Sequence, residues 1–557
     1  MKTLRVGYIL DEGTQSSFIH DIISRSKSAQ HYSVELLIIQ KTRSAKASGL
    51  FGSLGHYLKT HGLGRTLDRL GFAVIERLEK ILVQRLSRLA IHYRRFPLET
   101  IEVETLDVTP QVSKNGFVYR FTDEDLARIR EKNLDLLLRG GSGILRGKIL
   151  DVCPFGVLSF HHGENNVNRG GPPGFWEVYG REPCTGFVIQ QLKDELDGGD
   201  VLFKGSIPTA PLYLLNQLKL SAKANVFLHK LLEKIGREGK LPQPYPKVPY
   251  AYPLYRMPNL RRQLAYVIKT TFHLGRRIVR KLVGREARWA VAYQFVGDWK
   301  NAVLWRSKVI KNPPNRFLAD PFVVYRDGRY VCFVEDYYYA EKKGDVAAYE
   351  ITSDGYKELG TALREDFHLS YPFLLEADGG LYMCPETAQA NAIRLYKCTE
   401  FPLKWALHKV LMANVGAADT TIFKANDRWW MLTNIDSSDV ADHGSELHLF
   451  YADSFDSSEW TAHPQNPVVF DAARARNGGF IADRDGLFRA FQIPGFDIYG
   501  AALGVARITE LTTTTYREEP LFTVPPAFFE GLEGTHSYSF SNGLLAIDFE
   551  RIERRRT

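Results

Sequence analysis

The sequence is poor in cysteine, and the few cysteines that it has are scattered. There are 5 in 557 residues, and no two of them form a Cys-x-x-Cys pair. An odd and dispersed set argues against a disulfide framework and against a zinc site, and it suits a reducing compartment. We therefore expect a cytoplasmic protein without a resident metal. The cysteines are Cys153, Cys184, Cys332, Cys384 and Cys398.

Long apolar runs are also absent, since no uninterrupted apolar segment is long enough to span a bilayer. The first ten residues contain Arg5 within a short apolar run and lack a small-residue cleavage site. They predict a first strand and not a signal peptide. The excess of positive over negative charge is modest for this length, with a net charge of +8, and no aromatic-basic RNA motif stands out. We expect a solvated surface and no nucleic-acid partner.

The chain is too long for a single core, because domains usually hold ~100–200 residues. Its patterns predict three parts, namely 1–210, 211–290 and 291–557. The first part opens as strand, helix and strand, which predicts an open parallel α/β sheet of the Rossmann-like kind. Residues 43–96 interrupt this pattern as a helical insertion. Strands are expected near 4–10, 34–39, 134–138, 156–160, 185–190 and 200–205, and helices near 16–26 and 122–132.

The middle part is expected to connect two domains. Residues 211–240 predict a helix, and Pro242–Pro258 is rich in proline and tyrosine, which predicts a linker. A basic amphipathic helix is expected from 258 to 283, because 8 Arg or Lys residues and no acid occur between 260 and 285. Such a helix can lie on an anionic membrane surface, and for a cytoplasmic protein this would be the inner face of the membrane. The alternative is a packed connector with a solvated basic face.

From about residue 295 the texture changes to short aromatic and β-branched strands that repeat loosely. Each repeat consists of a strand, a tight hairpin and a second strand. Five irregular repeats of ~50 residues predict an all-β five-bladed β-propeller. The repeats are 320–335, 370–386, 419–434, 478–492 and 536–550.

Polar residues stand at matching positions of these repeats. Equivalent positions on radially arranged blades face one axis, so these side chains are expected to meet at one mouth of the ring. Paired carboxylates there could hydrolyse glycosides, hold the ring together or bind sugar hydroxyls, and we favour binding. The set is Asp320, Glu335, Glu386, Asp419 and His536.

The segment 156–199 carries the clearest chemistry. Ser159-Phe160-His161-His162-Gly163 ends an apolar run, and Leu196-Asp197-Gly198-Gly199 forms a tight glycine loop. A histidine at a strand end and an aspartate in such a loop can form a proton-handling pair. The arrangement suits acyl chemistry on an amine.

These motifs resemble the formyltransferase family, which takes formyl from 10-formyltetrahydrofolate. Ser159-Phe160-His161 stands where the family has Asn-x-His, and three further motifs follow in register up to about residue 205. They are Arg169-Gly170, Thr185-Gly186 and Leu196-Asp197-Gly198-Gly199. The resemblance implies that His161 shuttles a proton, that Asp197 orients it and that Ser159 stabilises an oxyanion. It also implies 10-formyltetrahydrofolate as the formyl donor.

Two departures from the family pattern affect this interpretation. Ser159 replaces the family asparagine, and 163–166 replaces the Ser-Leu-Leu-Pro segment that lines the folate site. His162 or Asn165 could then supply a missing donor. Arg169 could hold an anionic group or pin the turn at Gly170, and Thr185 is expected beside the donor or substrate.

Other functions for these residues remain open. His161, His162, Glu164 and Asp197 could bind a metal for amide hydrolysis, although adjacent histidines on a strand point in opposite directions. Water could be the acceptor, as in formyltetrahydrofolate hydrolases. The whole chain could also be a glycan-binding scaffold without catalysis, or a glycosidase-like propeller joined to a deformylase or hydrolase.

The repeats resemble the five-bladed propellers of glycoside hydrolase family 43 through Ala319-Asp320-Pro321. They are more similar to the propeller region of glucosamine inositolphosphorylceramide transferases, which share Ala-Asp-Pro-Phe and Pro-Glu patterns. A carbohydrate-type propeller beside a formyltransferase-like domain implies an amino-sugar or glycan substrate. We therefore expect N-formylation of an amino sugar in surface polysaccharide biosynthesis.

Overall fold

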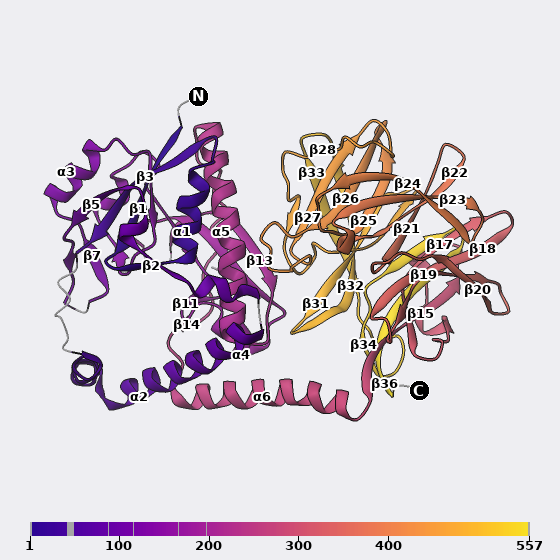
Figure 1. Cartoon of the computed structure of the whole chain (residues 1–557), viewed down its shortest axis with the longest axis horizontal. Coiled ribbons are helices and arrows are strands. Elements are labelled where there is room, and N and C mark those ends of the chain that lie inside the picture. Colours follow the sequence, from indigo (N-terminus) through magenta and orange to yellow (C-terminus); the bar gives the residue numbers. More distant parts are fainter. Residues whose placement is uncertain are drawn as a thin grey trace. The chain divides into compact units, whose positions relative to one another are not determined.

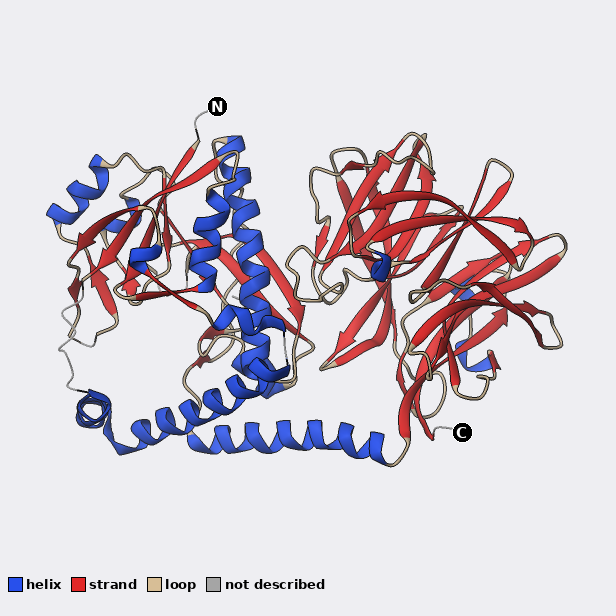
Figure 2. Ribbon diagram, in the orientation of Figure 1, coloured by secondary structure: helices blue, strands red, loops and turns tan. Residues whose placement is uncertain are grey.

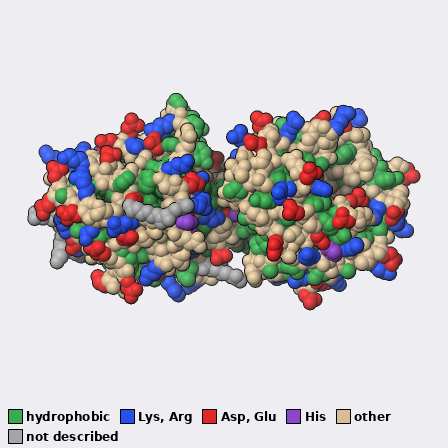
Figure 3. All heavy atoms as spheres, turned by 90° about the horizontal axis from the view of Figure 1, so that it is seen from above, with side chains coloured by type: hydrophobic (Ala, Val, Ile, Leu, Met, Phe, Trp, Pro, Cys, Tyr) green, Lys and Arg blue, Asp and Glu red, His purple; other side chains and the backbone are tan. Residues whose placement is uncertain are grey.

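The computed structural model describes residues 3–41, 49–86, 88–114, 116–164, 166–195 and 198–554. The chain divides into two compact units, Met1–Thr271 and Phe272–Thr557. The first unit mixes helices with strands, whereas the second consists almost wholly of strands (Figure 2). Acidic, basic and hydrophobic side chains alternate on the face shown in Figure 3, as expected for a modest net charge.

The first unit is built on one sheet with the strand order β13-β12-β10-β8-β1-β3-β5. Five neighbouring strands run parallel, and β12 and β13 add an antiparallel edge. The inner parallel strands are short and mostly apolar, as expected for strands covered on both faces, whereas the edge strand β5 alternates exposed and buried residues along its second half. The bounds are β1 (Leu4–Asp11), β3 (Tyr32–Gln40), β5 (Glu104–Val108), β8 (Leu136–Arg139), β10 (Val157–His161), β12 (Cys184–Gln191) and β13 (Asp200–Pro208).

Smaller elements complete this unit around the sheet. Short strands pair as β2 (Thr14–Ser16) with β4 (Arg95–Pro97), and as β6 (Gln111–Val112), β7 (Val118–Arg120) and β9 (Ile144–Leu145). The helices are α1 (Ser17–Ser26), α2 (Gly49–Leu86), α3 (Asp123–Glu131), α4 (Phe175–Gly180), α5 (Tyr213–Glu238) and α6 (Leu260–Leu282), the last of which continues into the second unit.

The start of α3 shows how local sequence sets a boundary. The Thr122 hydroxyl accepts a hydrogen bond from the backbone N–H of Asp125 at 3.1 Å, which caps an otherwise unsatisfied donor. The Asp125 carboxylate does not return to Thr122, because it accepts from the N–H of Thr109 at 3.1 Å. Thr122 therefore caps the helix without the reciprocal bond of a capping box, and Asp125 ties the helix to the end of β5.

Helix α5 is a core element of the first unit and not part of a linker. Sixteen of its residues are buried, and it packs against α1, α2, β12 and β13. The inserted helix α2 packs on it, and the Glu79 carboxylate of α2 accepts the N–H of Leu214 at 2.8 Å. The division between units accordingly lies near residue 271. Broad apolarity around α5 distinguishes a packed helix from a connector.

The second unit contains five antiparallel sheets within the described residues. The first strands of consecutive sheets lie against one another in the cycle β17, β21, β25, β30, β35 and back to β17. This closed cycle is the arrangement of a β-propeller. Its strands β17, β21 and β25 are labelled in Figure 1. The first three sheets are β17 (Arg316–Arg326), β18 (Arg329–Tyr338), β19 (Lys343–Ile351) and β20 (Tyr356–Leu363); β21 (Ser370–Ala377), β22 (Gly380–Glu386), β23 (Ala392–Glu400) and β24 (Lys404–Ala413); and β25 (Ala417–Ala425), β26 (Arg428–Ile435), β27 (Glu446–Ala452), β28 (Thr461–Ala462) and β29 (Val469–Phe470).

The last sheet joins the two ends of this unit. Strand β15 pairs with β36 over eleven positions, from Arg285 opposite Arg554 to Phe295 opposite Leu544. The ring is thus closed by backbone hydrogen bonds between segments far apart in sequence. The last two sheets are β30 (Asn477–Asp483), β31 (Gly486–Gly495), β32 (Ile498–Leu511) and β33 (Tyr516–Val524); and β15 (Arg285–Phe295), β16 (Lys308–Ile310), β34 (Leu532–Gly534), β35 (Tyr538–Ser541) and β36 (Leu544–Arg554).

The fold class expected from the sequence is confirmed, namely an α/β open-sheet unit joined to an all-β propeller unit. The sequence did not indicate the antiparallel edge made by β12 and β13. All five predicted strand–hairpin–strand repeats occur as antiparallel pairs.

A close approach between α5 and the start of β3 gives a test of this packing. A Cβ on Gly236 would lie 2.0 Å from the carbonyl oxygen of His31. Gly236→Ala should therefore destabilise the first unit by about 1–3 kcal/mol, measured by urea denaturation followed by circular dichroism. Gly64→Ala is the control, because nothing lies within 4 Å of a Cβ there. A loss of similar size in both variants would contradict the packing.

Candidate functional site

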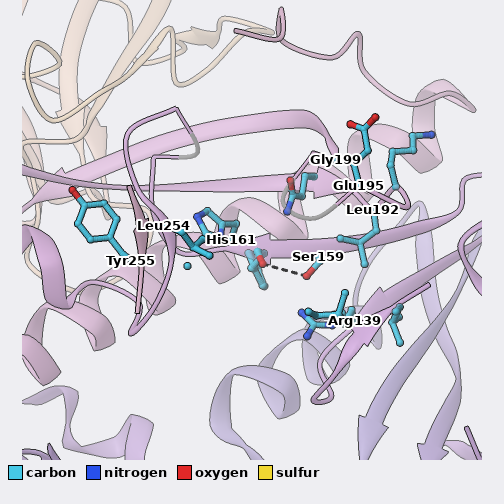
Figure 4. A pocket seen from close by; sticks show the side chains of 14 residues that line it. Arg139, Ser159, His161, Leu192, Glu195, Gly199, Leu254 and Tyr255 are labelled. Atoms are coloured by element: carbon cyan, nitrogen blue, oxygen red, sulfur yellow. Dashed lines mark hydrogen bonds between the residues drawn. The ribbon is translucent and has the colours of Figure 1, made fainter. Parts of the chain in front are cut away.

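A cavity of about 320 Å³ opens at the carboxyl ends of β8 and β10 in the first unit (Figure 4). Ligands of open α/β sheets bind at this edge, and the volume lies within the range of small-molecule sites. The cavity is lined by Arg139, Ile144, Leu145, Ser159, Phe160, His161, Gly170, Gln190, Leu192, Lys193, Glu195, Gly199, Leu254 and Tyr255.

Three polar side chains share one face of the sheet at this cavity. Ser159 and His161 are two residues apart on β10, so both point to the same side. Gln190 lies directly opposite Ser159 in the antiparallel pairing of β10 with β12. Cross-strand partners share a face, so a serine hydroxyl, an imidazole and an amide meet here. Gln190 is 3% exposed, and its Oε1 has no hydrogen-bond partner within the described part of the chain.

The loop after β10 orients His161. Its Nε2 lies 2.8 Å from the carbonyl oxygen of Asn168, and a carbonyl can only accept, so Nε2 carries a proton. In the neutral ring Nδ1 then holds the lone pair. Asn168 is itself fixed, since its side-chain amide donates to buried Glu177 at 2.7 Å. Gly163 leaves room for this contact, because a Cβ there would lie 2.9 Å from the Asn168 oxygen.

His162 points to the other side of the strand and stacks on Phe160, with ring centroids 5.3 Å apart. Burial, reinforced by the neighbouring His161, lowers the pKa of His162 to about 4. His162 is therefore neutral near pH 7 and does not add a cation to the cavity.

Arg169 and Gly170 attach the proline-rich segment to the first unit. They form β11, which pairs in parallel with β14 (Leu254–Tyr255). Gly170 has a φ of +106°, and a Cβ there would lie 2.0 Å from the Tyr255 carbonyl oxygen, so only glycine fits. The Arg169 guanidinium stacks on the Tyr250 ring at 4.5 Å. The expected linker thus supplies a wall of the cavity.

Thr185 lies away from the cavity. It is fully buried, and its hydroxyl bonds the Thr209 hydroxyl at 2.9 Å and the Asn216 amide at 2.9 Å. Its role here is to hold β12 to the start of α5. Two predicted site residues, Asn165 and Asp197, lie outside the described residues.

The metal alternative finds no support in the arrangement of Glu164. Its carboxylate forms an ion pair with Lys204 at 2.9 Å, and the two histidines point to opposite faces. Within the described ranges, a group of His, Cys, Asp or Glu spaced for a metal ion occurs only at Asp320, His536 and Asp548 of the second unit.

The five polar residues predicted for the propeller lie in one electrostatic network. Asp320 faces His536 at 3.2 Å. Burial raises the pKa of Glu335 well above its usual value, and the charges of Asp320 and Glu386 add to this effect. Asp419 forms an ion pair with Arg476 at 2.7 Å, and Arg476 also faces Glu386 at 3.7 Å. The network therefore runs across the first strands of the ring.

A repeated backbone feature aims these side chains. β17, β21 and β25 each carry a bulge, and within it Asp320, Tyr371 and Asp419 adopt positive φ values of 47°, 45° and 49°. Non-glycine residues rarely adopt this conformation, so the surrounding contacts must hold it. Asp320 accepts the N–H of Tyr371 at 3.1 Å, which ties one sheet to the next.

His536 occupies the centre of this network as a cation. Burial disfavours its charged form, but Asp548 and Asp320 outweigh burial and hold the pKa of His536 well above its usual value. Its Nδ1 lies 2.8 Å from Asp548, so both ring nitrogens face carboxylates. The imidazolium thereby takes the place that a metal ion would need. Burial raises the pKa of Glu386 to about 8, with Asp419 adding to the effect.

Sequence reasoning missed the residues that other segments bring to the cavity. Gln190, Arg139 and Tyr255 carry no motif, and they reach His161 through strand pairing alone. The available signal for Gln190 was a pair of glutamines, Gln190 and Gln191, at the end of the apolar run 187–189.

The fold and the cavity together define a formyltransferase-like α/β unit joined to a β-propeller unit. Residues 289–538 match the sequence family described as "Glucosamine inositolphosphorylceramide transferase 1, N-terminal". The protein of that name from Oryza sativa subsp. japonica is 33% identical over 220 residues, which is 37% of this chain and 28% of the rice protein. Methionyl-tRNA formyltransferase of Acetivibrio thermocellus is 27% identical over 201 residues, covering 35% of this chain and 61% of that protein.

Among solved structures, a putative glycoside hydrolase from Bacteroides ovatus ATCC 8483 covers 47% of this chain and 97% of its own, with 12% identity and a TM-score of 0.32. Both sequence resemblances, to formyltransferases and to glucosamine inositolphosphorylceramide transferases, are confirmed. The chain spans less than a third of the rice relative and less than two thirds of the bacterial one. Both relatives are transferases by name.

The axial network predicts a large effect of removing its cation. His536→Gln leaves Asp320 and Asp548 buried without a counter-charge, so it should destabilise the second unit by about 3–5 kcal/mol in chemical denaturation. Arg428→Gln is the control, because its partner Asp453 is 92% exposed and such pairs contribute about 0–1 kcal/mol. Equal effects of the two substitutions would contradict the network.

The same residue predicts a pH dependence. The folded pKa of His536 lies well above 6.5, so the folded state binds the extra proton above that pH and the unfolded state does not. The stabilisation from His536 is complete below pH 6.5 and is lost as pH rises through the folded pKa. Wild type should therefore lose more stability than His536→Gln between neutral and alkaline pH, measured by denaturation at each pH.

Proposed function

We propose that this protein transfers a formyl group to the amine of an amino sugar. The observation that carries the proposal is the meeting of His161, Ser159 and Gln190 on one face at the carboxyl end of β10. Such an edge position, an oriented imidazole and two hydrogen-bond donors suit acyl transfer to nitrogen. The formyltransferase resemblance gives the acyl group, with 10-formyltetrahydrofolate as donor.

One side chain would handle the proton of the amine, and two others would stabilise the negative charge on the formyl oxygen. With Nε2–H donated to Asn168, the Nδ1 lone pair of His161 would accept the proton that the amine loses as the new C–N bond forms. The imidazolium would then give this proton to the nitrogen of the donor as its bond to the formyl carbon breaks. The Gln190 amide and the Ser159 hydroxyl donate to the negative charge that develops on the formyl oxygen. Gln190 thereby supplies the amide that the family asparagine would provide at position 159. The unpartnered Gln190 Oε1 is an acceptor that is left for an N–H or O–H group of a ligand, whereas the donation to the oxyanion would come from Nε2.

The cavity fits the reacting end of a formyl donor. Its apolar walls include Ile144, Leu145 and Leu254, and its polar groups converge on the His161 side. A bound donor would supply the formyl group, whereas Ser159, His161 and Gln190 position it and manage the proton. The volume of about 320 Å³ is too small to enclose both the donor and the sugar. The sugar would therefore stay at the rim of the cavity and only its amine would enter.

The amino-sugar acceptor follows from the two resemblances taken together. The rice relative has glucosamine, an amino sugar, in its name, and the bacterial relative is named as a formyltransferase. The acceptor would belong to surface polysaccharide biosynthesis, and the propeller unit would bind a glycan by itself. The five cysteines are all free, which agrees with a cytoplasmic location.

The proposal is tested with the full chain, 10-formyltetrahydrofolate and a panel of nucleotide-linked amino sugars, followed by mass spectrometry. We expect one sugar to gain a formyl group. His161→Asn should abolish this gain, and Gln190→Leu should lower kcat by ~10²–10³ because an oxyanion donor is lost.

Gln191→Leu is the matched control, because Gln191 follows Gln190 on β12 and bonds the Phe155 carbonyl on the other side of the strand at 3.1 Å. It should leave kcat unchanged. Formate release without a sugar acceptor would identify a hydrolase and overturn amine transfer. A Gln190→Leu enzyme as fast as wild type would remove Gln190 from the mechanism.

A further inference from the structure

Two helices of this protein expose apolar side chains to solvent over most of their length. Leu264 is 61% exposed, Phe272 71% and Leu282 80%, which is unusual for large apolar side chains on a folded domain. On α2 the exposed set is Leu63, Leu67, Leu70, Val74, Leu78, Ile81 and Leu82. On α6 it is Leu260, Leu264, Val267, Ile268, Phe272, Ile278, Val279 and Leu282.

The exposed residues of each helix form a stripe opposite the face that packs. Residues 63, 67, 70, 74, 78 and 81 of α2 follow the three-and-four spacing of one helix face. The other face of α2 is buried through Phe72, Ile75 and Val83. Helix α6 repeats this division, since Gln263, Tyr266 and Thr270 form its buried side. A helix packed on one side normally turns a polar face to water. On α2 and α6 the outward face is apolar instead, and the described part of the chain does not cover it.

The two helices are fixed to each other within the first unit. Asp68 of α2 accepts the N–H of Leu260 at 2.8 Å through its carboxylate and the Gln263 amide at 2.6 Å through its carbonyl. Gly71 allows this approach, because a Cβ there would lie 2.5 Å from Gln263 Oε1. Tyr266 also donates to the buried carboxylate of Glu79. The stripe of α2 and the stripe of α6 up to residue 271 therefore belong to neighbouring helices of the first unit, which run beside each other there in Figure 1.

The charges beside the stripes are almost all positive. Eight Arg or Lys residues and no acid occur between 260 and 285. The acids of α2 near the stripe turn inward, since Asp68 caps α6 and Glu79 is 5% exposed. The mixed surface of Figure 3 lacks this bias. The basic side chains of the first unit are Arg65, Arg69, Arg77, Lys80 and Arg85 on α2, and Arg261, Arg262 and Lys269 on α6. Farther along α6, Arg277 and Arg280 form ion pairs with Asp497 and Glu533.

We propose that α2 from 63 to 86 and the part of α6 that lies in the first unit, 260 to 271, form one surface that binds the plane of an anionic lipid bilayer. Apolar stripes flanked by cations match such an interface, where apolar side chains enter the headgroup boundary and cations meet lipid phosphates. A second copy of the chain would bring the same cations together, which is unfavourable. No described helix is long and apolar enough to cross a membrane, so the helices would lie along it.

The surface extends beyond the membrane contact that the sequence indicated. The pattern of 258–283 predicts one amphipathic helix, whereas the structure adds α2 through the contacts of Asp68 and Gly71. Two adjacent helices bury more apolar area than one, so both should contribute to lipid affinity.

The test measures co-sedimentation of the full chain with phosphatidylcholine vesicles, with and without phosphatidylglycerol. Binding should require the anionic lipid and should weaken as salt rises from about 0.05 to 0.5 M, because screening shortens the reach of the cations. Leu264→Glu on α6 and Leu78→Glu on α2 should each lower lipid affinity about tenfold or more, since each buries a charge in place of a leucine.

Leu407→Glu on β24 is the matched control, because Leu407 is also an exposed leucine at 48% and lies outside the proposed surface. It should bind vesicles as wild type does, and thermal unfolding should be the same for all four proteins. Absence of binding at low salt overturns the proposal. Loss in Leu264→Glu alone overturns the two-helix surface, and a wild-type dimer that both helix variants dissociate assigns the stripes to a second copy.

Discussion

A buried network of charges at the axis is the interaction on which the propeller unit depends. Asp320 connects three sheets at once, through His536, Ser537 and the N–H of Tyr371. Each of these groups would be costly to bury alone, so the network is stable only when the ring is closed. Closure in turn requires β15 to pair with β36 from the other end of the unit. The left-handed backbone of Asp320 and Asp419 is held by the same contacts.

This dependence limits what the axial acids can do. Asp320 and Asp419 are 5% and 2% exposed, and both are engaged with cations, so they hold the ring before they meet any ligand. Burial raises the pKa of Glu335 well above its usual value and that of Glu386 to about 8, so it favours the protonated form of these two carboxyls. A protonated carboxyl donates hydrogen bonds, and such groups suit sugar hydroxyls at the mouth of the ring.

The cavity of the first unit depends on a different constraint, the return of the chain after β10. The loop that replaces the family segment ends at Asn168, whose carbonyl fixes the His161 tautomer. The next residues pair with Leu254–Tyr255, so the proline-rich segment closes the cavity and leads into α6. The loop after β10, the cavity wall at 254–255 and the start of α6 are therefore connected through the pairing of β11 with β14. A change in the Gly170 turn would act on all three.

The sequence by itself determined the two fold classes, the repeats of the propeller and the position of His161 at a strand end. Local hydrophobic periodicity and turn residues determine those features, and both depend on only a few neighbouring residues. Only the tertiary structure decided that Gln190 lies beside Ser159, that α5 is core, that Thr185 is buried structure and that α2 joins α6. Each depends on pairing or packing between segments far apart in the chain, and local patterns do not encode which distant segment becomes the neighbour.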